Sequence, residues 1–133
     1  MNYKSPIQHT KQSTDHNNNE AVRLCVENID VVGLCAGTHN EKSCLLLAKL
    51  MDENGMPRDD HRVFFAQLLG MSDNISFNLA QHGYNVAKYV PYGPIHKVMP
   101  YLFRRAKENT AIAGQSGREL TMIKKEIKRR KSA

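Results

Sequence analysis

The sequence contains no tryptophan and only three cysteines among its 133 residues. Cys25, Cys35 and Cys44 are ten and nine residues apart, which fits neither a CxxC motif nor the spacing of zinc ligands. We therefore expect three small apolar side chains in a reducing compartment, and no metal site. The sequence also lacks any apolar run of about 18 residues, so it predicts no membrane-spanning helix.

Positive charge is distributed unevenly. The whole chain has 19 Lys and Arg against 13 Asp and Glu, a net charge of +6. Residues 104–133 contribute 10 − 3 = +7, and the first 103 residues sum to 9 − 10 = −1. The basic run at 124–131 leaves a small nucleic-acid-binding module open as an alternative function, but the absence of interleaved aromatic residues favours a solvated helix end and no nucleic-acid partner.

Apolar runs and helix caps alternate along the chain. This order of helices and strands predicts right-handed crossovers and a parallel sheet, and therefore an α/β fold. The expected strands cover residues 30–36, 62–68 and 85–90. The expected helices begin at the candidate N-caps Thr14 or Asp15, Thr38 and Ser72, and after Gly93. Gly55 and Gly83 are expected to end the second and third helices.

Each expected strand ends in a segment that contains polar residues. Thr38, His39 and Asn40 come after the first strand, Gln67 and Leu68 end the second, and Lys88 and Tyr89 end the third. Because parallel strands end at one edge of a sheet, these residues can converge on one site. The first group also lies at a helix N-terminus, which suits an anion such as a phosphate, although a helix cap with a bystander histidine is about equally favoured.

The helix that begins near Ile95 has two faces. At 100° per residue, one is an apolar stripe, and the other carries Tyr101, Arg104, Arg105 and Glu108. Paired guanidinium groups beside a tyrosine are suited to clamping a carboxylate. The alternative is a solvated face with an ordinary Arg104–Glu108 pair. Pro100 weighs against a plain surface helix, because an interior proline costs about 3 kcal/mol.

A break is expected at residues 114–117, followed by a basic helix over 118–131 with Leu120, Ile123 and Ile127 on one stripe. The expected organisation is therefore a loop over residues 1–13, an α/β domain over 14–113 and a basic helical tail over 114–133.

Four segments taken together resemble the C-terminal part of the proline dehydrogenase family, in order and in spacing. They are Gly37–Asn40, Phe65–Asp73, Tyr84–Gly93 and Tyr101–Asn109, and the resemblance extends from about Tyr3 to Arg130. It implies about three βα units from the C-terminal portion of a distorted (β/α)₈ TIM barrel, plus the basic C-terminal helix.

The resemblance also implies a function. Members of the family oxidise L-proline to Δ1-pyrroline-5-carboxylate with FAD, as the first step of proline degradation, and pass electrons to a membrane quinone. The implied FAD-binding residues are Thr38, His39, Asn40, Gln67 and Glu108. By the same resemblance, Glu108 also supports the arginine pair. The implied proline-binding residues are Leu68, Tyr89, Tyr101, Arg104 and Arg105. No catalytic nucleophile is expected, because the cofactor carries the redox step.

The same resemblance implies a mitochondrial location, with peripheral association with the inner membrane. The related hydroxyproline dehydrogenases are an alternative that shares the barrel and the arginine pair. Gly37 departs from the alanine that is common in the family. The first five barrel strands and a transit peptide have no counterpart in the sequence, so we expect a fragment that is inactive by itself.

Overall fold

The computed structural model describes residues 8–111 and 113–131, and within these ranges it leaves out the side chains of Ala106 and of residues 108–119. The chain divides into two compact units, Met1–Tyr89 and Val90–Ala133, which we describe separately. The first unit contains α1 (Lys11–Glu27), β1 (Leu34–Gly37), α2 (Glu41–Glu53), β2 (Val63–Leu68), α3 (Asp73–Gln81) and β3 (Val86–Tyr89). The second contains α4 (Ile95–Ala111) and α5 (Ala113–Lys131).

The three strands form one parallel sheet in the order β1-β2-β3. The predicted α/β class and the predicted parallel strands are confirmed. Only the start of the first strand was wrong, because β1 begins at Leu34 and not near Asp30. The N–H groups of Val31 and Val32 donate to the carbonyl of Asn28 in a turn after α1, so this part of the apolar run cannot join the sheet.

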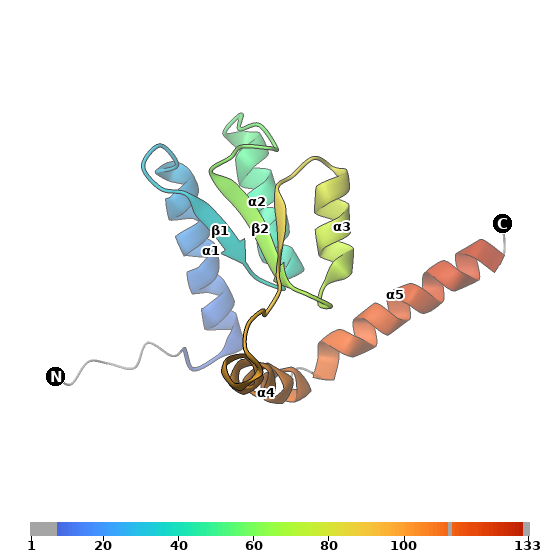
Figure 1. Cartoon of the computed structure of the whole chain (residues 1–133). Helices are drawn as coiled ribbons and strands as arrows, with labels where there is room; N and C mark the ends of the chain where they lie inside the picture. The colour runs from blue at the N-terminus through green and yellow to red at the C-terminus, as the bar shows by residue number, and fades with distance from the viewer. Residues whose placement is uncertain (1–7, 112, 132–133) are drawn as a thin grey trace. The chain divides into compact units, whose positions relative to one another are not determined.

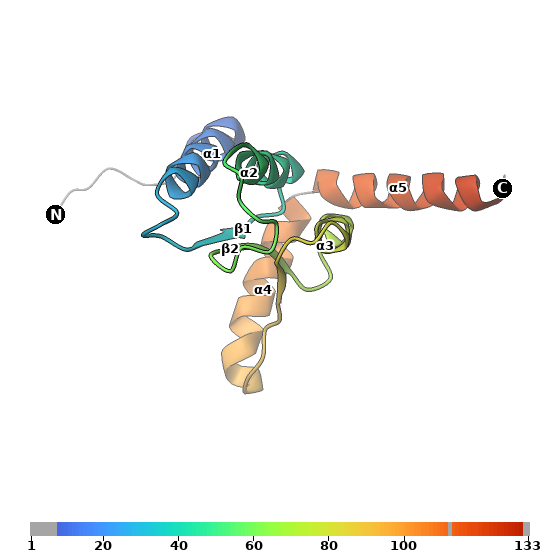
Figure 2. The same ribbon diagram turned by 90° about the horizontal axis from the view of Figure 1, so that it is seen from above.

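Helices α1 and α2 lie along one face of the sheet, and α3 lies beside β2 and β3 (Figures 1 and 2). The core forms where the helices meet this face. Its most deeply buried side chains are Leu47 and Met51 of α2 and Val63 and Phe65 of β2. Phe65 also packs edge-to-face against Tyr84, with the ring centroids 5.4 Å apart.

Side chains alternate between the two faces of β2, as the period of a strand requires. Val63, Phe65 and Gln67 are buried under the helices. Phe64 lies between two of them and is 39% exposed, and its partner in the register, Cys35 of β1, is exposed. The opposite face of the sheet is therefore more open than the helix-covered face.

The start of α1 differs from the prediction. Thr10 caps the helix in a capping box with Ser13, whose backbone N–H donates to Thr10 Oγ1 over 3.1 Å. The helix therefore begins at Lys11, ahead of the predicted caps Thr14 and Asp15, and the last residues of the predicted 1–13 loop are helical. Serine replaces the usual glutamate in this box, which is why the pattern is hard to find in the sequence.

A cluster of charged groups holds the N-terminal edge of the sheet together, opposite the edge where the predicted site residues lie. Arg62 donates to the buried carboxylate of Asp60 over 2.7 and 2.9 Å and also reaches Asp30. Asn85, just before β3, donates to the carbonyls of Asp60 and Val63. The hydrogen bonds from Arg62 hold the pKa of Asp60 well below its usual range.

The second unit consists of helices. α4 continues through Pro100 to Ala111, and Pro94 accepts the first helical hydrogen bonds through its carbonyl. α5 begins at Ala113, so the break predicted over residues 114–117 was wrong. A glycine in a helix costs about 1 kcal/mol, which weakens a helix without ending it. Within the described residues, no helix is both long and apolar enough to span a membrane.

Candidate functional site

The loops after β1 and β2 are joined at the carboxyl edge of the sheet. His39 Nδ1 lies 3.0 Å from the Oγ of Ser72, although the two residues are 33 positions apart. Ser72 is buried and has a left-handed backbone, with φ 51° and ψ 41°, which is uncommon outside glycine. Its hydroxyl meets the imidazole and does not cap α3. The predicted convergence of the first two loops is therefore present.

Thr38 and Asn40 shape the turn that leads into α2. Asn40 is the N-cap, and its side chain accepts from the N–H of Lys42 over 3.0 Å. The predicted capping role of Thr38 was wrong, because its Oγ1 instead accepts from the N–H of Asn40 over 3.1 Å. Both side chains hold the backbone on either side of His39 in place.

Gln67 is buried on the helix-covered face of β2. Its Nε2 donates to the carbonyl of Thr38 over 3.3 Å, and its Oε1 accepts from the hydroxyl of Ser76 over 2.8 Å. The amide thus connects the end of β1 to α3. In this arrangement it supports the turn that carries Thr38 and His39.

Leu68 and Tyr89 are direct partners in the β2–β3 register, so their Cα atoms lie side by side at the ends of the two strands. Tyr89 is 53% exposed, and Leu68 is partly exposed. An aliphatic and an aromatic side chain at neighbouring strand ends form a surface that suits an apolar ring.

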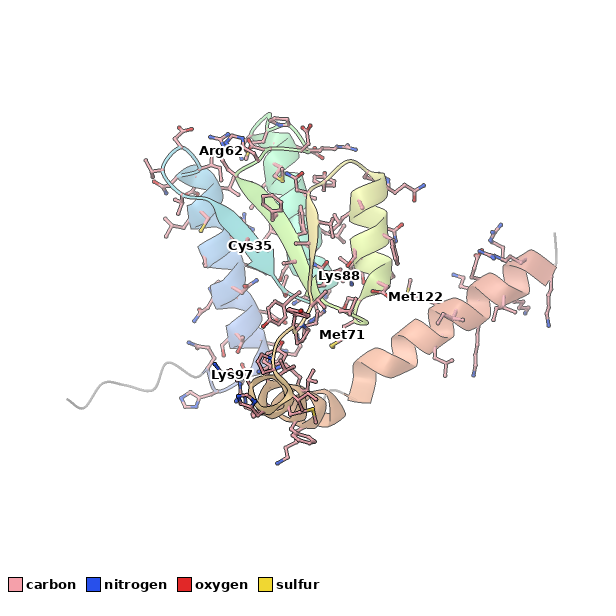
Figure 3. The ribbon with its side chains drawn as sticks, in the orientation of Figure 1. Cys35, Arg62, Met71, Lys88, Lys97 and Met122 are labelled. Atoms are coloured by element: carbon pink, nitrogen blue, oxygen red, sulfur yellow. The ribbon has the colours of Figure 1, made fainter. Side chains whose placement is uncertain are left out.

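The sequence placed Lys88 at the end of the third strand without assigning it a role, and the structure shows that it secures this strand at the carboxyl edge. Its Nζ donates to the carbonyl of Met71 over 2.7 Å and to the carboxylate of Asp73 over 2.8 Å. Lys88 and Met71 lie at the same end of the sheet, and Arg62 lies at the other end (Figure 3). A lysine one position before Tyr89 was visible in the sequence, but its partners lie at least 15 residues away.

The second unit brings Tyr101 and Arg105 together on α4. The guanidinium carbon of Arg105 lies 5.5 Å from the centre of the Tyr101 ring, in a cation–π contact across one helical turn. Arg105 is partly buried, and Arg104 is exposed. Glu108 belongs to the same helix, but its side chain lies outside the described residues. One part of the predicted clamp is therefore preformed within a single helix.

The sequence profile described as proline dehydrogenase matches residues 1–118. The chain belongs to the proline dehydrogenase family. It is 38% identical to proline dehydrogenase 2, mitochondrial, of Arabidopsis thaliana and 39% identical to proline dehydrogenase 1, mitochondrial, of Homo sapiens, each over 98% of this chain. It is also 38% identical to hydroxyproline dehydrogenase of Xenopus laevis, over 96% of this chain. The resemblance found in the sequence is thus confirmed.

A solved structure gives the same indication for the fold. The crystal structure of proline utilization A (PutA) from Bdellovibrio bacteriovorus, inactivated by N-propargylglycine, superposes with a TM-score of 0.71 and 27% identity over 79% of this chain. This proline dehydrogenase family chain spans about a quarter of the length of its curated relatives, 28% of the Arabidopsis protein and 22% of the human one. It spans 11% of the PutA chain.

The carboxyl edge of the sheet is chemically suited to part of a flavin site. His39, Thr38 and Asn40 offer imidazole, hydroxyl and amide groups at the start of a helix, where the dipole favours the phosphates of a dinucleotide. Gln67 fits direct contact less well, because both ends of its amide already bond to protein groups. Among the described residues, no cluster of His, Cys, Asp and Glu could hold a metal ion.

Proposed function

We propose that this chain forms part of an FAD-dependent oxidoreductase that converts L-proline into Δ1-pyrroline-5-carboxylate, the first step in the degradation of proline to glutamate. The observation that carries the proposal is the Tyr101–Arg105 pair on α4, within a chain of the proline dehydrogenase family. In this role the guanidinium groups of Arg105 and Arg104 bind the substrate carboxylate through parallel N–H···O bonds. Tyr101 holds Arg105 in place and lines the pocket for the proline ring.

The proposed framework is the C-terminal portion of a distorted (β/α)₈ barrel, with β1, β2 and β3 as consecutive barrel strands. The parallel order and the helices that pack on one face of the sheet support this assignment. In such a barrel, ligands bind at the carboxyl ends of the strands, where Thr38, His39, Leu68 and Tyr89 lie. Leu68 and Tyr89 then face the substrate ring from neighbouring strands.

Thr38, His39 and Asn40 would hold the flavin directly, Gln67 through the turn that it supports, and Glu108 from α4. A bound flavin would supply the two-electron acceptor for the oxidation of proline. The protein groups orient the substrate, and the Ser72 hydroxyl orients the imidazole of His39. No side chain needs to act as a nucleophile.

The proposed electron acceptor is a membrane quinone, and the proposed location is the mitochondrion, in peripheral association with the inner membrane. The names of the Arabidopsis and human relatives support the location. A second candidate substrate is hydroxyproline, which the 38% identity to the Xenopus laevis protein favours. Competition between the two substrates in one assay would distinguish these candidates.

A chimera tests the proposed function directly. The segment of human proline dehydrogenase 1 that matches this chain is replaced by residues 1–133, and proline-dependent quinone reduction is measured. We expect bound flavin and measurable turnover. A folded chimera with bound flavin but no response to proline or hydroxyproline would contradict the assignment. The 133-residue chain alone is expected to bind flavin weakly and to turn over no proline, because its sheet encloses only part of such a ligand.

A further inference from the structure

The described part of α5 has a narrow apolar face. Leu120, Ile123 and Ile127 follow one another at spacings of three and four, and they are 49–57% exposed. At about 100° per residue, the three side chains fall within an arc of about 60°. On the same projection Lys124 and Lys131 border this arc on one side, and Arg130 borders it on the other.

The rest of the helix surface is strongly basic. Residues 120–131 contain six Lys and Arg and one acidic residue, Glu126, which gives 6 − 1 = +5. Glu126 accepts hydrogen bonds from Arg129 and Arg130 over 2.8–2.9 Å, and these bonds lower its pKa to about 2. Glu126 is therefore charged at neutral pH, and it offsets only a small part of the positive charge.

We propose that α5 lies in the plane of a membrane surface rich in anionic lipids and binds that surface peripherally. The aliphatic stripe enters the boundary between headgroups and acyl chains, and the bordering cations extend to the lipid phosphates. This proposal deepens the membrane association proposed above, because it names the element of the chain that makes the contact. The proposal rests on the charge and the exposed stripe of α5. Most of this helix lies beyond residues 1–118, the part of the chain that matches the family profile.

An anionic lipid surface fits α5 better than a protein surface does. Two copies of this segment would each carry +5 and would repel each other. Three aliphatic side chains also fall far short of the roughly 800 Å² per partner that a stable protein interface buries. A lipid surface offers an apolar layer next to an anionic layer, and this matches a stripe bordered by cations. Clusters of about four to eight Lys and Arg on an amphipathic helix are typical of such binding.

Vesicle co-sedimentation of the full 133-residue chain tests the contact. We expect binding to phosphatidylcholine vesicles that contain about 30% phosphatidylglycerol, little binding to pure phosphatidylcholine, and loss of binding at high salt. The double variant Lys124→Glu/Lys131→Glu should bind at least tenfold more weakly. Lys42→Glu/Lys49→Glu, which makes the same charge change on α2, should bind nearly as the parent does.

A single tryptophan reports whether the stripe enters the lipid, because the chain has none of its own. We expect the fluorescence of Ile123→Trp to shift to the blue on anionic vesicles. Lys125→Trp, about 160° around the helix, should shift little. Circular dichroism confirms that each variant keeps its helices.

The proposal would be overturned by equal binding to neutral and anionic vesicles, by equal loss of binding in the α2 and α5 variants, or by equal fluorescence shifts at positions 123 and 125. Binding to soluble polyglutamate but not to vesicles would also overturn it and would assign the basic face to an acidic protein. Because these experiments measure lipid binding and not flavin or proline, their failure is distinct from failure of the proposed function.

Discussion

The two units of the chain differ in how they bury their apolar side chains. In the first unit, Leu47, Met51 and Phe65 are completely buried between the helices and the sheet. In the second, the large apolar side chains along α4 and α5, such as Ile95 and Leu120, are mostly exposed. The first unit therefore has a core of its own, whereas the described large apolar side chains of the second unit stay largely accessible.

This difference separates two ways of building a binding site. The His39–Ser72 contact joins two loops and exists only when β1 and β2 pair. The Tyr101–Arg105 contact spans one turn of α4, so both of its side chains belong to a single helix. We expect damage to the core to abolish the first contact and to leave the second largely intact.

The largest expected effect comes from the core of the first unit. Phe65→Ala should lower the free energy of unfolding by about 3–5 kcal/mol, because it leaves a cavity beside Tyr84. The matched control is Phe64→Ala on the open face of the same strand, which should cost much less. Urea denaturation followed by circular dichroism measures both. Equal losses would show that the open face of β2 is packed as tightly as the covered face.

A smaller effect is expected at the N-terminal edge of the sheet. Since the folded pKa of Asp60 is lowered, its contribution to stability is present above the unfolded pKa of about 4 and is lost as the pH falls through the folded pKa. Asp60→Asn should lower the melting temperature at pH 7 by several degrees, and its difference from the parent should shrink in acid.

Asp59→Asn is the control for this measurement, because Asp59 is the exposed neighbour of Asp60. Melting curves recorded between neutral and acidic pH follow both variants. A difference between Asp60→Asn and the parent that stayed constant across this range would contradict the role of the Arg62–Asp60 pair.

The smallest expected effect leaves the fold unchanged. Cys44 is buried, and burial raises the pKa of its thiol to about 11, whereas Cys35 is exposed on the open face of the sheet. Alkylation at pH 8 should therefore modify Cys35 rapidly and Cys44 only after unfolding. Mass spectrometry of the two peptides, with and without urea, measures the difference. Rapid labelling of Cys44 in the native chain would mean that α2 opens readily from the sheet.

Local signals in the sequence predicted much of this fold. Gly55 and Gly83 both have positive φ and follow the C-caps of α2 and α3, where a residue without a Cβ carries no strain. The start of α1 was missed because Ser13 replaces the usual glutamate of a capping box. The start of β1 was missed because an apolar run does not reveal which of its residues form a turn.

For the candidate site, the sequence predicted side-chain contacts only between residues that are close together along the chain. Tyr101 and Arg105 are four residues apart, so helical spacing alone predicts their contact. Ser72 and Lys88 reach partners 15 to 33 residues away, and only the pairing of the strands brings those groups together. Local patterns thus identified the residues of the carboxyl edge but not the side chains that hold them in place.

Proline kinetics of Arg105 variants in the human chimera test the central claim most directly. Arg105→Met should raise the KM for proline roughly ten- to hundredfold, because a charge-assisted contact to a carboxylate contributes about 1.5–3 kcal/mol. Arg105→Lys should raise the KM for proline nearly as much as Arg105→Met does, since lysine offers a point charge in place of the planar guanidinium group. Flavin content and the melting temperature should stay at parental values, and Lys107→Met, a neighbouring loss of charge, should change KM little. An unchanged KM in a folded, flavin-loaded Arg105→Met chimera would contradict the account and place Arg105 on a solvated helix face.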